Sequence, residues 1–391
     1  MKNKKLLQKL LVTSLAIESL TFTPQIYLGD FPLVSIAHAD YETIDIERGA
    51  IATQMFDEAH KFAEQNNYNE TVIYYTKAIQ FYPNYLEAYN DRGFAYSKLK
   101  NYSKAIEDYT KAIQIDPNIA VIYYNRGIVY SKLENYSQAI KDFTKATQLK
   151  SNDVDTYYNR GRAYSELKDY SKAIEDYNKV IQIDSNNADV YYSRGSVYYD
   201  LKNYTQAIED NNKAIQLNSN DAASYNNRGL VYSKLKNYNK AIEDYNKAIQ
   251  IDPDDSIAYY NRGIAYSYLN NHNKAIEDFT KAIQIDPNYA TSYSSRGFEY
   301  FKLKNYNKAI EDFSKAIQLN SNYAIAYNNR GSAYAELKDY NKAIEDFNKA
   351  IQINPNYAKV YHKRGLAYRA LGGNDRAEKD LARAKELGYN E

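Results

Sequence analysis

The chain has 391 residues, and its 50 Lys and Arg residues nearly balance its 49 Asp and Glu residues. This neutrality argues against nucleic acid or an anionic membrane as a partner, since both select a net positive surface. The chain contains no Cys, which excludes disulfides, thiolate metal sites and a cysteine nucleophile. It has 45 Tyr residues and no Trp, so part of its core must be built from rings whose hydroxyl groups need a partner.

The first 39 residues have the pattern of a secretory signal peptide. Four Lys residues precede an apolar run at 10–17, Glu18 follows, and a second apolar stretch ends in Ala-x-Ala at 37–39. Neither run reaches the ~18–20 residues that span a bilayer. We therefore expect cleavage after Ala39, export to a periplasmic or extracellular space without a membrane anchor, and a polar linker at 40–51. The alternative is a retained segment on a cytoplasmic or membrane-associated protein.

From residue 52 onward the chain is an internal repeat. An Arg-Gly dipeptide returns every 34 residues without insertion or deletion, with its Gly at 93, 127, 161, 195, 229, 263, 297, 331 and 365. A constant period of this length indicates a solenoid, in which each repeat buries its apolar face against its neighbours. With the Gly at position 8, ten repeats begin at residues 52, 86, 120, 154, 188, 222, 256, 290, 324 and 358.

Each repeat has the pattern of two helices. In repeat 256–289, Tyr259, Gly263 and Tyr266 share one helical face, and a polar turn follows at 269–272. Residues 273–285 form a second amphipathic segment, which ends before a Pro at 287. A Gly in mid-helix costs about 1 kcal/mol relative to Ala. Its recurrence predicts that the paired helix comes too close for a Cβ atom, with small residues such as Ala275 opposite.

This order of residues resembles the tetratricopeptide repeat. The residues that carry the resemblance in repeat 256–289 are Tyr259, Gly263, Tyr266, Ala275, Phe279, Ala282 and Pro287. Arg262 stands where the family often has Leu. The resemblance implies an all-α, right-handed superhelical solenoid of antiparallel helix pairs. It also implies a non-enzymatic protein with a concave groove that binds peptides or protein segments.

Three repeats depart from the pattern. Repeat 52–85 lacks the Arg-Gly dipeptide, and the second helix of repeat 358–391 is densely charged, so we expect both to be caps. In repeat 188–221, Asn211 stands where the other repeats have Tyr, Phe or Leu. An unpaired buried amide costs about 1–3 kcal/mol, which predicts that this repeat is the least stable one.

The recurring Arg has an Asp sixteen residues later. The pairs are Arg92/Asp108, Arg126/Asp142, Arg160/Asp176, Arg194/Asp210, Arg228/Asp244, Arg262/Asp278, Arg296/Asp312, Arg330/Asp346 and Arg364/Asp380. The repeat without the Arg has Glu58 in its place and Tyr74 in place of the Asp, so both partners are lost together. We predict structural ion pairs, because a guanidinium can donate two bonds to one carboxylate. An arginine ladder that grips an anionic ligand is the alternative.

No catalytic motif accompanies the repeats. The four His residues lie in distant repeats or in the N-terminal segment, without metal-ligand spacing. The chain has no nucleophile elbow, phosphate-binding Gly loop or metalloprotease motif. We therefore expect no enzymatic activity, no metal and no cofactor.

The candidate binding residues follow from the resemblance, since the first helix of each repeat lines the groove in this family. The residues before the Arg are Asn125, Asn159, Ser193, Asn227, Asn261, Ser295 and Asn329, and those one step earlier include Tyr124, Tyr158, Tyr192 and Tyr260. An Asn amide can bond to a peptide backbone through both its donor and its acceptor. The alternative is that these side chains are ordinary solvent-exposed residues of the helix surface without a binding role.

Two Lys residues extend the candidate groove at its C-terminal end. Lys359 and Lys363, with Asn329, fit part of the carboxylate clamp found in some family members. Ser294 and Phe298 stand where that clamp needs Lys and Asn, so the resemblance is incomplete. The middle of the candidate groove is charged differently, with Asp155, Glu166, Asp189 and Asp200 opposed by Arg162.

We therefore expect an exported scaffold that binds an extended peptide or a partner protein and is itself a monomer or weakly self-associating. One alternative is an assembly factor of the cell envelope or of secretion that binds through a lateral surface. Another is a structural spacer. A transferase of the repeat-bearing glycosyltransferase kind is disfavoured, because the repeats occupy the chain up to residue 391.

Overall fold

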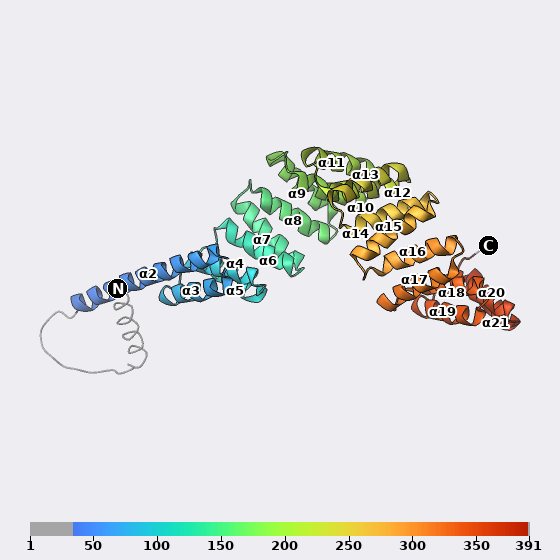
Figure 1. The fold of residues 1–391 in the computed structure, drawn as a ribbon. Helices are drawn as coiled ribbons and strands as arrows, with labels where there is room; N and C mark the ends of the chain where they lie inside the picture. Colours follow the sequence, from blue (N-terminus) through green and yellow to red (C-terminus); the bar gives the residue numbers. More distant parts are fainter. Residues whose placement is uncertain (1–33, 390–391) are drawn as a thin grey trace, which may run out of the picture. The chain divides into compact units, whose positions relative to one another are not determined.

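The computed structural model describes residues 34–389, with side chains from residue 45 onward, and this range consists of helices joined by short turns (Figure 1). Residues 1–33, which hold most of the predicted signal peptide, and residues 390–391 lie outside the described range. No strand occurs among the described residues. None of the helices within this range is both long enough and apolar enough to cross a membrane.

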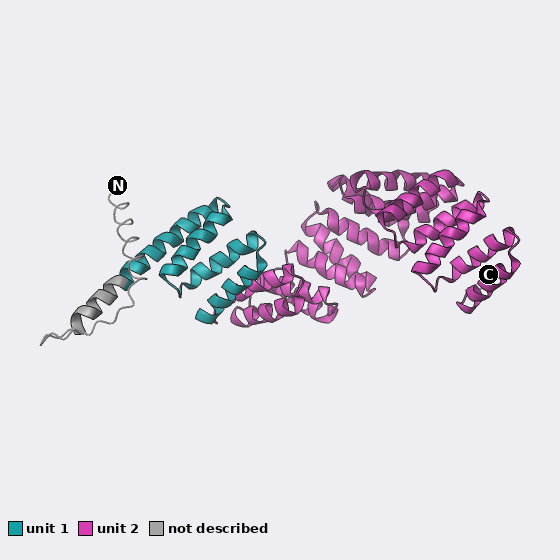
Figure 2. Cartoon of the chain, turned by 90° about the horizontal axis from the view of Figure 1, so that it is seen from below, with its two compact units in different colours: residues 1–115 teal, residues 116–391 magenta. Residues whose placement is uncertain are grey.

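The chain divides into two compact parts, residues 1–115 and 116–391, each taken by itself here (Figure 2). The N-terminal part contains α2 (Val34–Glu64), α3 (Tyr68–Phe81), α4 (Leu86–Lys98) and α5 (Tyr102–Ile115). Residues 40–51, the predicted polar linker, have a helical backbone and belong to α2. The first helix of repeat 52–85 is thus the C-terminal half of a 31-residue helix.

The C-terminal part is a stack of eight helix pairs. The first helices are α6 (Ala120–Lys132), α8 (Val154–Glu166), α10 (Ala188–Asp200), α12 (Ala222–Lys234), α14 (Ser256–Tyr268), α16 (Ala290–Lys302), α18 (Ala324–Glu336) and α20 (Ala358–Ala370). The second helices are α7 (Tyr136–Leu149), α9 (Tyr170–Ile183), α11 (Tyr204–Leu217), α13 (Tyr238–Ile251), α15 (His272–Ile285), α17 (Tyr306–Leu319), α19 (Tyr340–Ile353) and α21 (Asn374–Glu386). Each helix packs against the next one along the chain, which makes this part a solenoid.

The turn within each repeat has a left-handed residue at position 15. In repeat 256–289 this residue is Asn270, with φ of 56°, and the backbone N–H of Asn271 donates to the carbonyl of Tyr266. These are the features of a Schellman helix end. The Asn271 side chain then accepts from the N–H of Lys274 and caps the second helix. Local sequence therefore fixes both the end of one helix and the start of the next.

The Gly at position 8 makes room for an aromatic ring. A Cβ atom on Gly263 would lie 2.7 Å from Cε1 of Phe279, on the second helix of the same repeat. The predicted close approach is therefore present, but its partner is the ring of Phe279, not the small Ala275. Tyr or Phe occupies the same position in most other repeats, and Leu381 occupies it in the last one.

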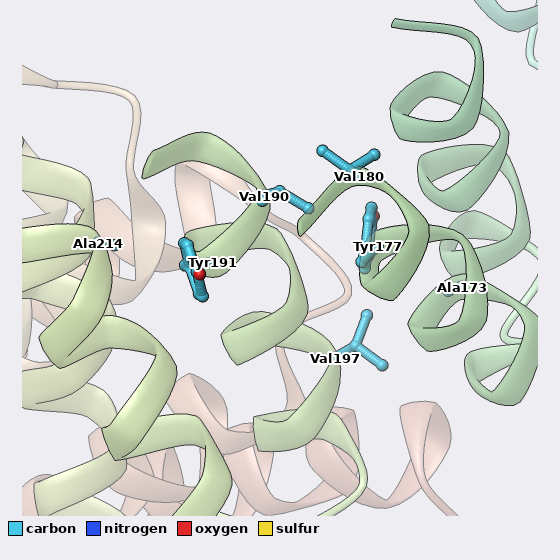
Figure 3. Close-up of a cluster of buried hydrophobic side chains, with 7 residues drawn as sticks. All are labelled: Ala173, Tyr177, Val180, Val190, Tyr191, Val197 and Ala214. Carbon is cyan, nitrogen blue, oxygen red and sulfur yellow. The ribbon is translucent and has the colours of Figure 1, made fainter. Parts of the chain in front are cut away.

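The core runs along the stack as a series of buried clusters. One cluster joins repeats 154–187 and 188–221, where Tyr177 of α9 and Tyr191 of α10 lie among Val180, Val190 and Val197 (Figure 3). Tyr177 is 1% exposed and Tyr191 is 8% exposed. Burial raises the pKa of Tyr177 far above its ordinary value, so its hydroxyl is neutral at any physiological pH. Some of the many Tyr side chains are thus part of the hydrophobic core.

Each Arg of the repeated dipeptide forms a bidentate ion pair with the Asp of its own repeat. In repeat 256–289 the Nε and Nη2 atoms of Arg262 lie 2.8 and 2.6 Å from the two carboxylate oxygens of Asp278. The Asp278 side chain is 7% exposed and that of Arg262 is 19% exposed. The guanidinium also lies over the ring of Tyr259, at 5.4 Å from its centroid. The same bidentate geometry occurs in all nine Arg-Gly repeats.

The carboxylates of these pairs are buried and are not a surface that a ligand can reach. Nε and Nη2 of Arg126 each lie 2.8 Å from one oxygen of Asp142, and those of Arg160 lie 2.8 and 2.7 Å from the oxygens of Asp176. Asp142 and Asp176 are both buried, like Asp278. Each of them therefore serves the packing of its own repeat. An anionic ligand that used the arginines would first have to displace these carboxylates.

The remaining nitrogen of the guanidinium connects neighbouring repeats. Nη1 of Arg262 donates to the Asn246 side chain at position 25 of the preceding repeat, at 2.6 Å. Seven further Arg residues bond the Thr, Ser or Asn at this position in the same way, the acceptors being Thr76, Thr144, Asn178, Asn212, Thr280, Ser314 and Asn348. Repeat 358–391 has Ala382 at this position. In the eight bonds above, the residue at position 25 is one whose side chain can accept from the Arg of the next repeat.

Asn211 is buried, but its amide is paired. Its side chain is 0% exposed, and its Nδ2 donates to the carbonyl of Ala207 at 2.7 Å. Its Oδ1 accepts from Nδ2 of Asn227, which also donates to Ser196. The predicted unpaired amide is thus wrong. Because Asn211 is smaller than an aromatic ring, the Asn227 side chain turns inward and is only 7% exposed.

The ion pair predicts the effect of replacing Arg262 with Met. A buried carboxylate left without its partner costs about 3–5 kcal/mol, so we expect that loss in the free energy of unfolding measured by urea denaturation. Burial already raises the pKa of Asp278. Loss of the guanidinium raises this pKa further, and a raised native pKa stabilises the fold at low pH, so the deficit must shrink as the pH falls. Arg262→Met with Asp278→Leu should recover most of the loss, and failure to do so would contradict a pairwise role.

The Asn pair predicts unequal costs for two matched substitutions. Asn227→Ala leaves the buried Oδ1 of Asn211 without its side-chain donor, which costs about 1–3 kcal/mol. Asn261→Ala, at the same position one repeat later, removes a half-buried amide and should cost less than about 1 kcal/mol. Hydrogen exchange of α11 and α12 would localise the effect. Equal losses in the two variants would contradict the proposed coupling.

Candidate functional site

The first helices of the C-terminal part line one face of the stack. Successive first helices contact one another, from α6 and α8 through α18 and α20, whereas successive second helices make no comparable contacts in the described range. A stack whose first helices lie closer together than its second helices must curve toward the first helices. We call the surface formed by α6, α8, α10, α12, α14, α16, α18 and α20 the inner face.

Side-chain hydrogen bonds join neighbouring first helices on this face. The residue at position 6 of one repeat bonds to the residue at position 5 of the repeat before it. Asn159 donates to the Tyr124 hydroxyl at 3.3 Å, and Asn261 donates to Asn226 at 3.1 Å. The hydroxyls of Tyr158 and Ser193 lie 3.1 Å apart, and Tyr260 is bonded to Ser295. We call these side chains the polar ladder.

The polar ladder is therefore partly occupied by contacts within the protein. Both N–H groups of Asn159 are donated, one to Tyr124 and one to the Asp155 carbonyl, so that its Oδ1 is the atom left to accept from a ligand. Asn329 accepts from Asn328 of its own repeat. The predicted donor-and-acceptor contact with a ligand backbone is thus reduced at Asn159.

The remaining predicted residues of the ladder differ in accessibility. Asn227 is buried against Asn211 and does not offer its amide to the surface. Asn125 and Tyr192 are half-buried, like most of the ladder. Burial raises the pKa of Tyr124, Tyr192 and Tyr260, so their hydroxyls are neutral and able both to donate and to accept at physiological pH.

The two predicted Lys residues lie on α20 and differ in their surroundings. Lys359 is exposed. Nζ of Lys363 is half-buried and donates to Ser332 at 2.6 Å and to Asn328 at 3.2 Å. Burial, and in second place the neighbouring Lys359, lower the pKa of Lys363 to about 8. Both acceptors are neutral, so these contacts satisfy its donors without neutralising its charge.

The predicted ion-pair residues lie apart from the accessible part of this site. Asp142 and Asp176 are on the second helices α7 and α9, and each is buried against the Arg of its own repeat. Their oxygens accept from Arg126 and Arg160. These four side chains therefore connect the first helix to the second helix within their repeats and are not candidates for direct contact with a ligand.

Two further lines of side chains lie on the inner face, at positions 2 and 9, of which sequence reasoning recognised the charged Asp155, Asp189, Arg162 and Lys359 but not the apolar Ile257 and Ile325. They lie one turn from the polar ladder on the same helices, by the spacing of an α-helix. Ile257 is 54% exposed, Ile325 is 49% exposed and Phe298 is 39% exposed. The signal for these positions was their variation between repeats, since position 2 reads Val121, Asp155, Asp189, Ala223, Ile257, Thr291, Ile325 and Lys359.

Ser267, His272 and Glu299 bring a hydroxyl, an imidazole and a carboxylate together. Glu299 is 2% exposed and accepts from Ser267 and from Nδ1 of His272, each at 2.6 Å. The Ser267 hydroxyl donates to the carboxylate and not to the imidazole, which differs from the arrangement of a Ser nucleophile and its His base. Within residues 45–389, no group of His and acidic residues could hold a metal ion.

Comparisons with known sequences identify the repeat. The profile of the tetratricopeptide repeat matches residues 86–119, 120–153, 222–255, 256–289 and 324–357. A second profile, described as TPR repeat, matches residues 161–202, 195–236 and 297–338, and a third tetratricopeptide repeat profile matches residues 347–379. The comparison with curated proteins gives no match.

Solved structures share the architecture. MamA is 31% identical over 41% of this chain and 93% of its own, with a TM-score of 0.39. YrrB, described as a TPR protein with an unusual peptide-binding site, is 28% identical over 48% of this chain and 96% of its own, with a TM-score of 0.40. A tetratricopeptide repeat protein from Parabacteroides merdae is 22% identical over 63% of this chain and 98% of its own, with a TM-score of 0.53, which supports the fold alone.

The profile matches follow one another along most of the range 86–379, and in the first profile each match begins where a first helix begins. The chain therefore belongs to the tetratricopeptide repeat family.

Proposed function

We propose that the protein is a non-enzymatic scaffold that holds an extended peptide, or a segment of a partner protein, along the inner face of residues 116–391. The observation that carries this proposal is the exposure of large apolar side chains on that face. Ile257, Phe298 and Ile325 come from three successive first helices and lie beside half-buried polar side chains. Exposed apolar residues that recur on one face commonly mark a protein interaction site.

The polar ladder supports the same proposal in a different way. It joins the first helices to one another before any ligand arrives, so the inner face is already ordered. A preorganised surface loses little conformational entropy on binding. The half-buried rings of Tyr158 and Tyr260 add rigid contact area with a polar hydroxyl.

A partner on this face would be captured by a photoreactive group placed there. We expect crosslinks to the partner when p-benzoylphenylalanine replaces Phe298 or Ile257 in the full chain. Glu243, exposed on the second helix α13, is the matched control position. The crosslinked partner is identified by mass spectrometry, and its yield should fall when unlabelled protein competes for it.

The same measurement separates the alternative functions. Crosslinks from position 243 but not from positions 257 and 298 would point to a lateral surface, as an assembly factor would use. No saturable crosslink from any of these positions would favour a structural spacer. Either result would overturn binding on the inner face.

We also propose that the protein is exported, on the basis of the Ala-x-Ala sequence at 37–39 and the basic, apolar segment before it. The mass of the intact protein recovered from the producing cells tests this. Cleavage gives a chain that begins at Asp40. A chain that retains residues 1–39 would contradict the predicted signal peptide.

A further inference from the structure

From α8 to α20 the inner face changes its chemistry in three successive zones, after a first repeat in which the apolar Val121 is 52% exposed. Resting on the proposed function, we infer that the bound partner segment is itself zoned, with basic residues at one end, apolar residues in the middle and carboxylates at the other end. The three zones are defined by positions 2, 6 and 9 of the first helices. They cover repeats 154–221, repeats 222–357 and repeat 358–391.

The first zone is acidic. Asp155 on α8 and Asp189 on α10 are exposed at position 2 and form no ion pair within the described part of the chain. Two further carboxylates of these repeats, Glu166 and Asp200, lie instead near tyrosines of the preceding second helices. Asp155 and Asp189 therefore face solvent, and Lys150, a cation near Asp155 at the end of the preceding second helix, is bonded to Asp153.

One basic residue accompanies these two carboxylates. Arg162 is exposed at position 9 of α8, and its guanidinium lies 6.0 Å from the centroid of the Tyr158 ring. Asn159, Ser193 and Ser196 occupy the other places at positions 6 and 9 of these two repeats and carry no charge. Two carboxylates against one guanidinium leave the first zone with a net negative charge.

A structural role does not account for these two Asp residues. An acidic residue in the first turn of a helix contributes about 0.3–1 kcal/mol through the helix dipole. The starts of α8 and α10 are already capped by the side chains of Asp153 and Asn187. The corresponding residues of α14 and α18 are Ile, and these helices have the same length. The charge at position 2 is therefore free to serve binding.

The second zone is apolar. Ile257, Phe298 and Ile325 are exposed by 54%, 39% and 49%, and the side chains of Leu230 and Ile264 are half-buried at position 9. No acidic or basic residue occupies position 2, 6 or 9 in repeats 222–357. Aliphatic or aromatic side chains of a partner would remove this surface from water on binding.

The third zone is basic. Lys359 and Lys363 lie at positions 2 and 6 of α20, and position 9 is Leu366, which is 44% exposed. Lys363 is half-buried between the neutral acceptors Asn328 and Ser332, and no carboxylate bonds to it. Burial makes its charge costly, Lys359 adds repulsion, and Glu336 opposes both effects to a smaller extent. A carboxylate from a partner would offset both effects.

The order of the zones restricts the occupant. An all-basic segment would meet repulsion at Lys359 and Lys363, and an all-acidic one would meet it at Asp155 and Asp189. A segment with basic, apolar and acidic blocks in that order satisfies all three zones at once. Charges placed to repel wrong partners give specificity and orientation more than affinity.

Synthetic peptides test the inference on the full chain. A zoned peptide has a Lys and Arg block, an apolar block of Ile and Phe, and a Glu and Asp block, and it is made in both chain directions. A control peptide of the same composition has its basic and acidic residues alternating on both sides of the apolar block. By fluorescence anisotropy we expect one of the zoned peptides to bind about tenfold more tightly than the control.

Charge reversal provides a matched pair of variants. Asp155→Lys with Asp189→Lys should weaken binding of the zoned peptide by about tenfold or more. Glu175→Lys with Glu209→Lys changes the net charge equally on the exposed second helices of the same two repeats, and should change binding by less than about twofold.

The outcomes separate this inference from the proposed function. Equal binding of the zoned and control peptides, no binding of either, or equal losses in both pairs of variants would overturn the zoned partner. Crosslinking from positions 257 and 298 could still succeed in that case, and the inner face would then bind a segment of another kind. If crosslinking from the inner face fails as well, the proposed function fails with it.

Discussion

The guanidinium of the repeated Arg joins the two directions of packing on which the solenoid depends. Within a repeat, Arg262 is bonded twice to Asp278 and thereby holds the second helix against the first. Between repeats, its third nitrogen reaches Asn246. One side chain thus connects the two helices of its own repeat and also connects that repeat to the preceding one. A single inserted residue between Arg and Asp would displace one partner by about 100° around its helix, which accounts for a period without insertions.

The period and the helix pair could be predicted from the sequence because both follow from residues that recur. The Gly at position 8 showed that the helices approach closely, but not that the ring of Phe279 fills the space above Gly263. Sequence spacing does not reveal which side chain of the facing helix turns inward. The same limit explains why the pairing of Asn211 was not predicted. Nothing in the sequence indicates that its side chain bonds to Asn227, sixteen residues later in the next repeat.

The candidate site was less predictable than the fold. The polar ladder was found because family resemblance points to the first helix, but its bonds between repeats depend on how closely α6, α8 and their successors approach. The exposed apolar residues at position 2 were missed, because reasoning from repeats favours what is constant. The inner-face residues Asp189, Ile257 and Lys359 occupy the same position in different repeats. Their difference is the information that a search for a period discards.

The structure thereby separates the positions that build the solenoid from those that are available to a partner. Arg262, Gly263 and Asp278 are repeated because every repeat must make the same two contacts. The polar ladder serves both purposes in part, because both N–H groups of Asn159 donate to other groups of the protein and only its Oδ1 is left for a ligand. Side chains at position 2 make no such recurring contact, and at position 9 only some do, such as Ser196 and Ser332, which accept from the next repeat. These variable positions are therefore where, on the proposed function, we expect a selective partner to be recognised.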